Sequence, residues 1–149
     1  MRATVQRVSH AEVTVAGEVV GRIGRGLLVY VGVARDDGPA DAAYIVEKII
    51  GLRIFNDSAG KMNLAVGDVG GGVLVISAFT LQADARKGRR PSFEAAAPPE
   101  PAEAMYRLVC EGLRAGNLPV ATGVFRAHMD VASENDGPIC VLLDSRRLF

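Results

Sequence analysis

Alternating and continuous apolar stretches predict β-strands over the first third of the chain and again near residue 75. Residues 3–15, ATVQRVSHAEVTV, alternate between apolar and polar side chains, and AGE separates them from VVGRIG, which is typical of a β-hairpin. The segments GLLVYVGVA (26–34) and VLVISAF (73–79) are continuous apolar runs of strand length. Such runs are typical of strands that are covered on both faces.

Two amphipathic helices are predicted as well. From Asp41 to about Arg53 apolar residues recur at helical spacing, and Pro39 suits a first helical turn. A second helix is expected to start near Pro101 and to end at AGN, residues 115–117. Its inward-facing side chains are expected to be Ala104, Met105, Leu108, Val109 and Leu113. The remaining residues supply two or three further strands, so the pattern predicts an α/β fold with a mixed, mostly antiparallel sheet and two main helices.

Length and composition indicate one globular domain. The chain has 149 residues, of which 49% are hydrophobic, enough for one core but not for two independent ones. Its 17 basic and 17 acidic side chains balance, which excludes a uniformly basic nucleic-acid-binding protein but permits a local basic patch. No leader is evident, and no apolar run approaches the roughly 18 residues of a membrane span. We therefore expect a cytoplasmic protein that does not bind a membrane.

The cysteines and histidines give no indication of a metal or cofactor site. Cys110 and Cys140 lack the spacing of a metal site or a disulfide framework, and both are expected to be buried. His10 and His128 have no Glu or Cys at ligand spacing, which favours exposed or hydrogen-bonded imidazoles. Neither a phosphate-binding loop nor a serine nucleophile motif is present, so no cofactor is expected.

The stretch ISAFTL (76–81) is a first candidate for chemistry. Ser77 and Thr80 interrupt aliphatic residues at the expected end of a buried strand. Their hydroxyls could cap that strand end or could face a catalytic pocket, because strand ends that lead into long loops are where sites are often built. The pattern leaves both interpretations open.

The stretch RKGRRPSF (86–93) is a second candidate. It places four cations within five residues, followed by a proline and a phenylalanine. Such a loop could bind phosphates and stack an aromatic ring on a base, or it could simply be solvated. The four cations are Arg86, Lys87, Arg89 and Arg90.

The stretch NDGPIC (135–140) is a third candidate, because its proline stands where an apolar strand, expected to be buried, begins. The Gly137–Pro138 bond belongs to the one class of peptide bond that is commonly cis, at about 5–6% of cases. A trans bond at a plain strand entry is therefore the default expectation.

Together these motifs resemble the D-aminoacyl-tRNA deacylase family. SAFTL, RKGRRPSF, GKMN (60–63) and NDGPIC occur in the order, and near the spacing, of that family. The opening MRATVQRVSHAEVTVAGEVVGRIGRGLLVYVGV is similar to its N-terminal hairpin and first core strand. The similarity covers essentially the whole chain and implies one domain with a barrel-like sheet.

The resemblance implies an activity and a partner. Enzymes of this family hydrolyse the ester between a D-amino acid, or glycine, and the 3′-terminal adenosine of tRNA, and they need no cofactor and no DNA. They are homodimers in which each subunit inserts a cis Gly-Pro corner into the pocket of the other. On this chain the corner is Gly137–Pro138, and SAFTL forms the pocket wall.

The resemblance also implies roles for individual residues. The candidate catalytic residues are Ser77, Phe79 and Thr80, with the N–H groups of Phe79 and Thr80 forming an oxyanion hole and the ribose 2′-OH assisting attack by water. Thr80 is also the one candidate nucleophile, although no adjacent base is evident in the sequence. The supporting residues are Arg7, Met129 and Asn135. The residues expected to bind the acceptor-stem phosphates are Arg86, Lys87, Arg89 and Arg90.

Two positions depart from the family pattern. Ala78 stands where glutamine is usual, and Cys140 stands where threonine usually follows the Gly-Pro. Activity is expected to survive if the main chain does the chemical work. A related tRNA-editing hydrolase with shifted specificity and a non-catalytic RNA-binding module remain the alternative functions.

Overall fold

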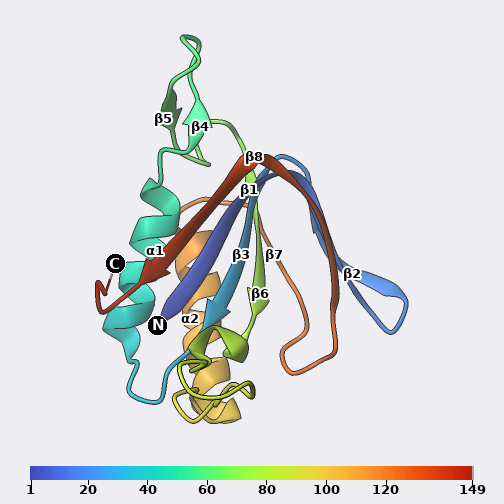
Figure 1. Cartoon of the computed structure of the whole chain (residues 1–149). Coiled ribbons are helices and arrows are strands. Elements are labelled where there is room, and N and C mark those ends of the chain that lie inside the picture. The colour runs from blue at the N-terminus through green and yellow to red at the C-terminus, as the bar shows by residue number, and fades with distance from the viewer. Residues whose placement is uncertain (149) are drawn as a thin grey trace.

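A six-stranded mixed sheet forms the centre of the computed structural model, which describes residues 1–148 (Figure 1). The strand order is β2-β1-β3-β6-β7, and β8 pairs with the other edge of β1. β1 runs antiparallel to β2, β3 and β8, whereas the β3–β6 and β6–β7 pairs are parallel. The elements are β1 (Arg2–Val15), β2 (Glu18–Ile23), β3 (Gly26–Gly32), α1 (Pro39–Gly51), β4 (Phe55–Asn56), β5 (Met62–Leu64), β6 (Gly72–Ser77), the 3₁₀-helix η1 (Phe79–Gln82), α2 (Pro99–Ala115), β7 (Val120–Thr122) and β8 (Asp130–Asp144). The predicted α/β class, mixed sheet and two main helices are confirmed.

The sheet curls until its two ends nearly meet. The pairing of β1 with β8 shifts register twice between Gln6 and His10, and such irregularities bend a strand pair. Beyond this bend β1 pairs with β2. Figure 1 shows the two long strands β1 and β8 bending together. A Cβ atom added to Gly21 of β2 would lie 2.6 Å from the carbonyl oxygen of Thr122 in β7. The sheet is therefore nearly closed, as the expectation of a barrel-like sheet required.

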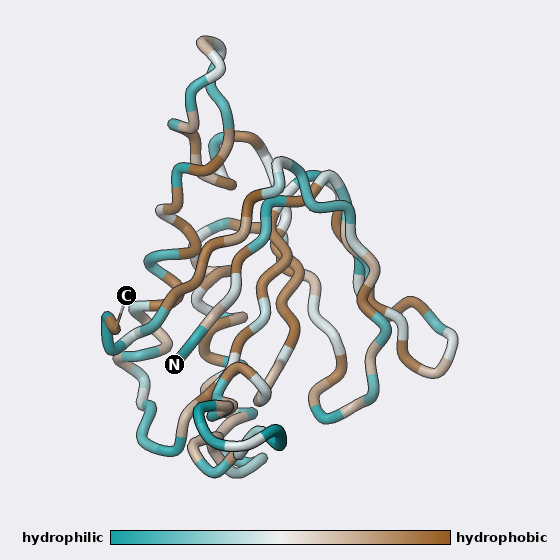
Figure 2. The backbone as a smooth tube through the Cα atoms, in the orientation of Figure 1, coloured by the Kyte–Doolittle hydropathy of each residue, from teal (hydrophilic) through white to brown (hydrophobic). Residues whose placement is uncertain are grey.

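Apolar side chains fill both sides of β3 and β6. Val29 and Val75 belong to the larger core, which lies between the sheet and the two helices. Leu28 and Leu74 belong to a smaller core inside the curled sheet. All four side chains are fully buried, and Figure 2 shows the hydrophobic colour concentrated along these strands. The apolar runs in the sequence are continuous because both faces of these strands are buried.

The first helix starts two residues earlier than the periodicity indicated. Pro39 occupies its first turn, and the Asp41 carboxylate accepts a hydrogen bond of 2.9 Å from the N–H of Gly38. This bond, with a second one from the Ser145 hydroxyl, holds the pKa of Asp41 below its usual range. Ala42, Ile45 and Ile49 are buried against the sheet.

The second helix differs in the face that it buries. Val109 and Leu113 are buried as predicted, and Met105 is partly buried against the core. Ala104 and Leu108 are exposed, so their inward placement was wrong. Tyr106 takes an inward position instead, because its hydroxyl donates a hydrogen bond to the carbonyl of Val75. The buried face is thereby rotated away from Leu108.

Two strand predictions also need correction. β6 ends at Ser77 rather than at residue 79, because the N–H of Ala78 bonds to Val31 and the chain then turns into η1. Cys140 is exposed, not buried, because β8 is an edge strand with an uncovered outer face. Leu142 on the same face is 59% exposed, whereas Cys110 is buried as expected. Between residues 1 and 148 no helix has the length and apolar character needed to cross a membrane.

Close backbone contact between β3 and β6 predicts a severe effect of Gly26→Ala. An added Cβ atom would overlap the carbonyl of Gly72, so the two strands would have to separate in the middle of the sheet. We expect a loss of about 3 kcal/mol in the free energy of unfolding, measured by chemical denaturation. Gly24→Ala is the matched control, since nothing lies within 4 Å of its added Cβ. Equal effects of the two substitutions would contradict this account.

Candidate functional site

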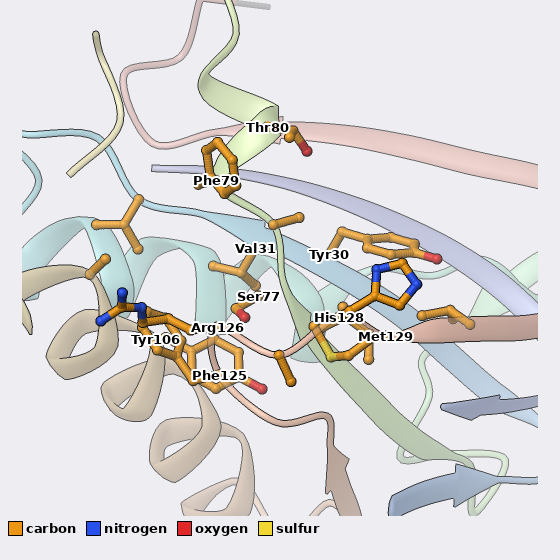
Figure 3. A pocket seen from close by; sticks show the side chains of 16 residues that line it. Tyr30, Val31, Ser77, Phe79, Thr80, Tyr106, Phe125, Arg126, His128 and Met129 are labelled. Carbon is orange, nitrogen blue, oxygen red and sulfur yellow. The ribbon is translucent and has the colours of Figure 1, made fainter. Parts of the chain in front are cut away.

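A cavity of about 420 Å³ lies where the parallel strands β3 and β6 end (Figure 3). Its walls come from the ends of these strands, from η1, from α2 and from the segment that enters β8. Ligands commonly bind at the carboxyl ends of parallel strands, because the loops that follow the strands converge there. The residues that line it include Tyr30, Ser77, Ala78, Phe79, Thr80, Tyr106, Phe125, Arg126, His128 and Met129.

Main-chain groups at the β6–η1 junction face this cavity. The N–H of Ala78 is used in the sheet, but the first N–H groups of a short helix have no partner within it. In residues 1–148 the N–H groups of Phe79 and Thr80 are without a protein acceptor. Two adjacent donors of this kind can hold a developing oxyanion.

The hydroxyl groups beside these donors have no activating neighbour. Over the described residues, neither Ser77 nor Thr80 hydrogen-bonds through its hydroxyl to a histidine or a carboxylate. Ser77, Phe79 and Thr80, which the sequence singled out, lie on one wall of the cavity, and no triad surrounds them within residues 1–148. This wall therefore offers two main-chain donors, whereas neither hydroxyl has a base hydrogen-bonded to it within the described residues.

Several cavity residues had no recognisable signal in the sequence. Tyr30 and His128 lie together on one side of the cavity, and Arg126 lies with Tyr106 and Phe125 on another (Figure 3). Burial raises the pKa of Tyr30 and that of Tyr106, so both phenols remain neutral hydrogen-bond donors. His128 was expected only as an exposed or hydrogen-bonded imidazole. It is exposed, and Nε2 lies 3.7 Å from an Asp130 oxygen.

The Gly137–Pro138 corner projects from β8 and is exposed. Its peptide bond is cis, as the resemblance implied and against the trans default. Gly137 has φ 139°, in the region that favours glycine. Asn135 Nδ2 donates hydrogen bonds of 2.9 Å to the carbonyls of Arg7 and Ile139, so one amide spans the corner.

Arg7 anchors the corner from the neighbouring strand. Its Nε donates to the carbonyl of Asp136 at 3.2 Å and lies 2.9 Å from the Asp136 carboxylate. Its Nη1 donates to the carbonyl of Ile54 at 2.6 Å, and its guanidinium lies over the ring of Phe55. Arg7 is only 7% exposed, and these partners satisfy it. Arg7 and Asn135, which the sequence proposed as supporting residues, both hydrogen-bond to the segment around the corner, whereas Met129 lies on the cavity wall.

Corner and cavity lie at opposite ends of β3. Arg7, beside the corner, pairs with Leu27, whereas Ser77 on the cavity wall pairs with Val31. Four residues of a strand span roughly 13 Å. Neither Gly137 nor Pro138 lines the cavity of its own chain.

The basic loop lies beside the cavity mouth and is held to it. Phe93 contacts Phe79 edge to face, with 5.2 Å between ring centroids, and the two rings are 38% and 58% exposed. Arg86 pairs with Asp84 at 2.6 Å and holds the pKa of that carboxyl well below its usual range. Within the described chain, the cations without an ion pair in this loop are Lys87, Arg89 and Arg90.

Neither cysteine suggests reactive chemistry, and no metal centre is evident. Burial raises the pKa of the Cys110 thiol, which keeps it neutral. Cys140 lies on the outer surface, with Sγ 3.9 Å from Nε2 of Gln6. Across residues 1–148, no cluster of three or more His, Cys, Asp or Glu side chains could hold a metal ion.

Known proteins resemble this chain over its whole length. A family model described as D-Tyr-tRNA(Tyr) deacylase matches residues 4–144. D-aminoacyl-tRNA deacylases from Anaeromyxobacter dehalogenans and Syntrophobacter fumaroxidans are 64% and 58% identical, and each alignment covers all of both chains.

Solved structures share the fold. One titled c-Myc DNA Unwinding Element Binding Protein is 40% identical, with a TM-score of 0.91 over 97% of this chain and 98% of the other. A probable eukaryotic D-amino acid tRNA deacylase is 17% identical, with a TM-score of 0.82 over 95% of this chain and 97% of the other, which shows a common fold alone. The full-length family match and the close relatives establish that this chain belongs to the D-Tyr-tRNA(Tyr) deacylase family.

Proposed function

We propose that this protein is a D-aminoacyl-tRNA deacylase, which acts in the cytoplasm on tRNA carrying a D-amino acid or glycine. Water attacks the ester carbonyl, the bond to the 3′ oxygen of the terminal adenosine breaks, and a free amino acid and tRNA leave. The observation that supports this most is the cavity wall at β6–η1, where the N–H groups of Phe79 and Thr80 are open to a ligand.

Catalysis in this proposal depends on the main chain and on the substrate. An aminoacyl ester is already activated, so the reaction needs stabilisation of the oxyanion more than a strong nucleophile. Donors such as the N–H groups of Phe79 and Thr80 contribute about 3–4 kcal/mol each in well-studied cases. The neighbouring ribose 2′-OH can assist the attacking water. This agrees with the hydroxyls of Ser77 and Thr80, which have no hydrogen bond to a histidine or a carboxylate within residues 1–148.

Selection of the D-enantiomer requires a rigid contact on one side of the substrate Cα. L- and D-residues carry identical groups, so only a fixed obstacle at the L-side-chain position separates them. The carbonyls of the Gly137–Pro138 corner suit this role, because Arg7 and Asn135 hold the segment on both sides. Glycine, which has no side chain, would not be excluded.

The corner would act in the cavity of a second copy of the chain. It is exposed and lies at the end of β3 opposite to its own cavity, so it is free to enter that of a partner. We therefore propose a homodimer in which each subunit completes the site of the other.

The acceptor end of the tRNA would bind across the cavity mouth. Lys87, Arg89 and Arg90 can neutralise phosphates of the acceptor stem, and Arg86 can join them if it exchanges Asp84 for a phosphate. The exposed rings of Phe79 and Phe93 can stack on a nucleobase. No base-reading role for double-stranded DNA is part of this proposal.

Hydrolysis of D-Tyr-tRNA and L-Tyr-tRNA tests the proposed activity. We expect release of D-tyrosine at least about a hundredfold faster than release of L-tyrosine, equivalent to about 2.7 kcal/mol. Ester loss is followed with labelled amino acid under single-turnover conditions. Hydrolysis without a D preference would support the editing hydrolase with shifted specificity. Binding of tRNA without hydrolysis would support a binding module.

Substitution of Thr80 by alanine distinguishes the main-chain mechanism from a nucleophilic one. Because the substitution keeps the N–H group, we expect the rate on D-Tyr-tRNA to fall less than about tenfold. A loss beyond about a hundredfold would favour the hydroxyl as nucleophile. Thr14→Ala, in β1 and outside the cavity, is the matched control.

Mixing two variants tests whether the corner acts across subunits. Asn135→Ala removes two hydrogen bonds of about 1 kcal/mol each, so L-Tyr-tRNA hydrolysis should rise about tenfold. Ala78→Trp fills the cavity and should inactivate its own site. An excess of the Ala78→Trp chain should then restore the D preference of Asn135→Ala, because it supplies an intact corner to each open cavity.

The control for this experiment is the double variant Asn135→Ala, Ala78→Trp. In excess it supplies no intact corner, so the D preference of Asn135→Ala should stay low. If the single variant Ala78→Trp also leaves the preference unchanged, the corner does not act between chains.

A further inference from the structure

Arg126 has a backbone conformation that arginine rarely adopts. Its φ is 65°, in the left-handed region, where a side chain meets steric resistance that glycine avoids. It lies in the segment between β7 and β8 and lines the cavity beside Phe125 (Figure 3). Ala16, Asn117 and Arg147 also have a positive φ, but of these four residues only Arg126 lines the cavity. Backbone strain at a cavity wall is a common feature of functional sites.

The charge of Arg126 is alone in the cavity wall. The other lining residues are apolar, hydroxyl-bearing or aromatic, apart from the imidazole of His128, and no carboxylate is among them. Six of the fourteen arginines have an ion-pair partner in the described chain, as Arg7 has in Asp136 and Arg107 has in Glu103. Among the eight that have none, Arg126 is the one that lines this cavity. Arg126 has no ion pair within residues 1–148. A free guanidinium on an otherwise uncharged wall suits an anionic ligand.

The proposed substrate has one negatively charged group near its ester bond. The amino group of the substrate is neutral or cationic, and the ester and ribose are uncharged. The 5′-phosphate of the terminal adenosine is the nearest negative group. We propose that Arg126 binds this phosphate and so positions the ester at Phe79 and Thr80. This inference rests on the proposed deacylase function and adds a positioning residue outside the basic loop.

A carboxylate in the side chain of the amino acid, as in D-Asp or D-Glu, is a second anion that the Arg126 guanidinium could bind. Arg126 would then select the amino acid instead of the nucleotide. Kinetic measurements distinguish the two anions, because every aminoacyl-tRNA has the phosphate but only some have the side-chain carboxylate.

Minimal esters test the phosphate contact directly. The wild-type protein should hydrolyse the D-tyrosyl ester of adenosine 5′-monophosphate with a kcat/KM about tenfold above that of the D-tyrosyl ester of adenosine. In Arg126→Gln the two values should become nearly equal. Arg114→Gln is the matched control, because Arg114 is an exposed arginine on α2 that does not line this cavity. An unchanged ratio in Arg126→Gln would overturn the proposal.

Full-length substrate provides a second measurement. On D-Tyr-tRNA, Arg126→Gln should raise KM about tenfold with little change in kcat, and the slope of log KM against log salt should fall by about one. Loss of a D-Asp over D-Asn preference with the phosphate ratio intact would assign Arg126 to the substrate carboxylate instead. Absence of any hydrolysis by the wild-type protein would refute the deacylase function itself, which is a different result.

Arg126→Gly separates ligand binding from a structural role. Glycine accepts φ 65° without strain, so the thermal unfolding midpoint should stay equal or rise, while the preference for the phosphorylated ester disappears. If Arg126 were structural, the midpoint would fall and both esters would be affected alike.

Discussion

Parallel pairing of β3 with β6 is the constraint on which the rest of the structure depends. Both strands are buried on their two faces, and glycines at Gly26 and Gly72 let their backbones approach closely at the start of the pair. Because the strands run in the same direction, both end at one edge of the sheet, where the cavity forms. β1 runs antiparallel to β3, so the residues that brace the Gly137–Pro138 corner lie at the other edge. The corner and the cavity are therefore separated within one chain, and the homodimer proposed above rests on that separation.

Local patterns in the sequence were sufficient for the elements but not for their environment. The hairpin, the two helices and the buried strands were predicted because their apolar spacing reflects the faces they bury. The burial of Cys140 was predicted wrongly because ICVLL reads as a buried run, whereas the structure puts it on an edge strand. Whether a strand lies at an edge depends on which partners pair with it, and short stretches of sequence do not contain that information.

The site was predicted to the extent that it is continuous in the chain. Ser77, Phe79 and Thr80 follow one another along one wall, so a motif could identify them. Tyr30, Tyr106 and His128 come from β3, α2 and the entry to β8, and only the tertiary fold brings them to the same cavity. The position of Arg126 on the cavity wall and its φ of 65° likewise cannot be read from its residue type.

The cations near the corner, the basic loop and the cavity differ in whether a carboxylate of the protein pairs with them. Arg7 and Arg86 each have a carboxylate partner, and their charges are satisfied within the protein. Lys87, Arg89, Arg90 and Arg126 have none within residues 1–148. Arg126 lies on the cavity wall, and the loop of the other three contacts that wall through Phe93 and Phe79. A chain with zero net charge attracts RNA only through such local imbalance, because its distant field is weak. In the proposed function the unpaired cations of the loop and of the cavity wall supply this imbalance, and the departures at Ala78 and Cys140, which carry no charge, leave it unaltered.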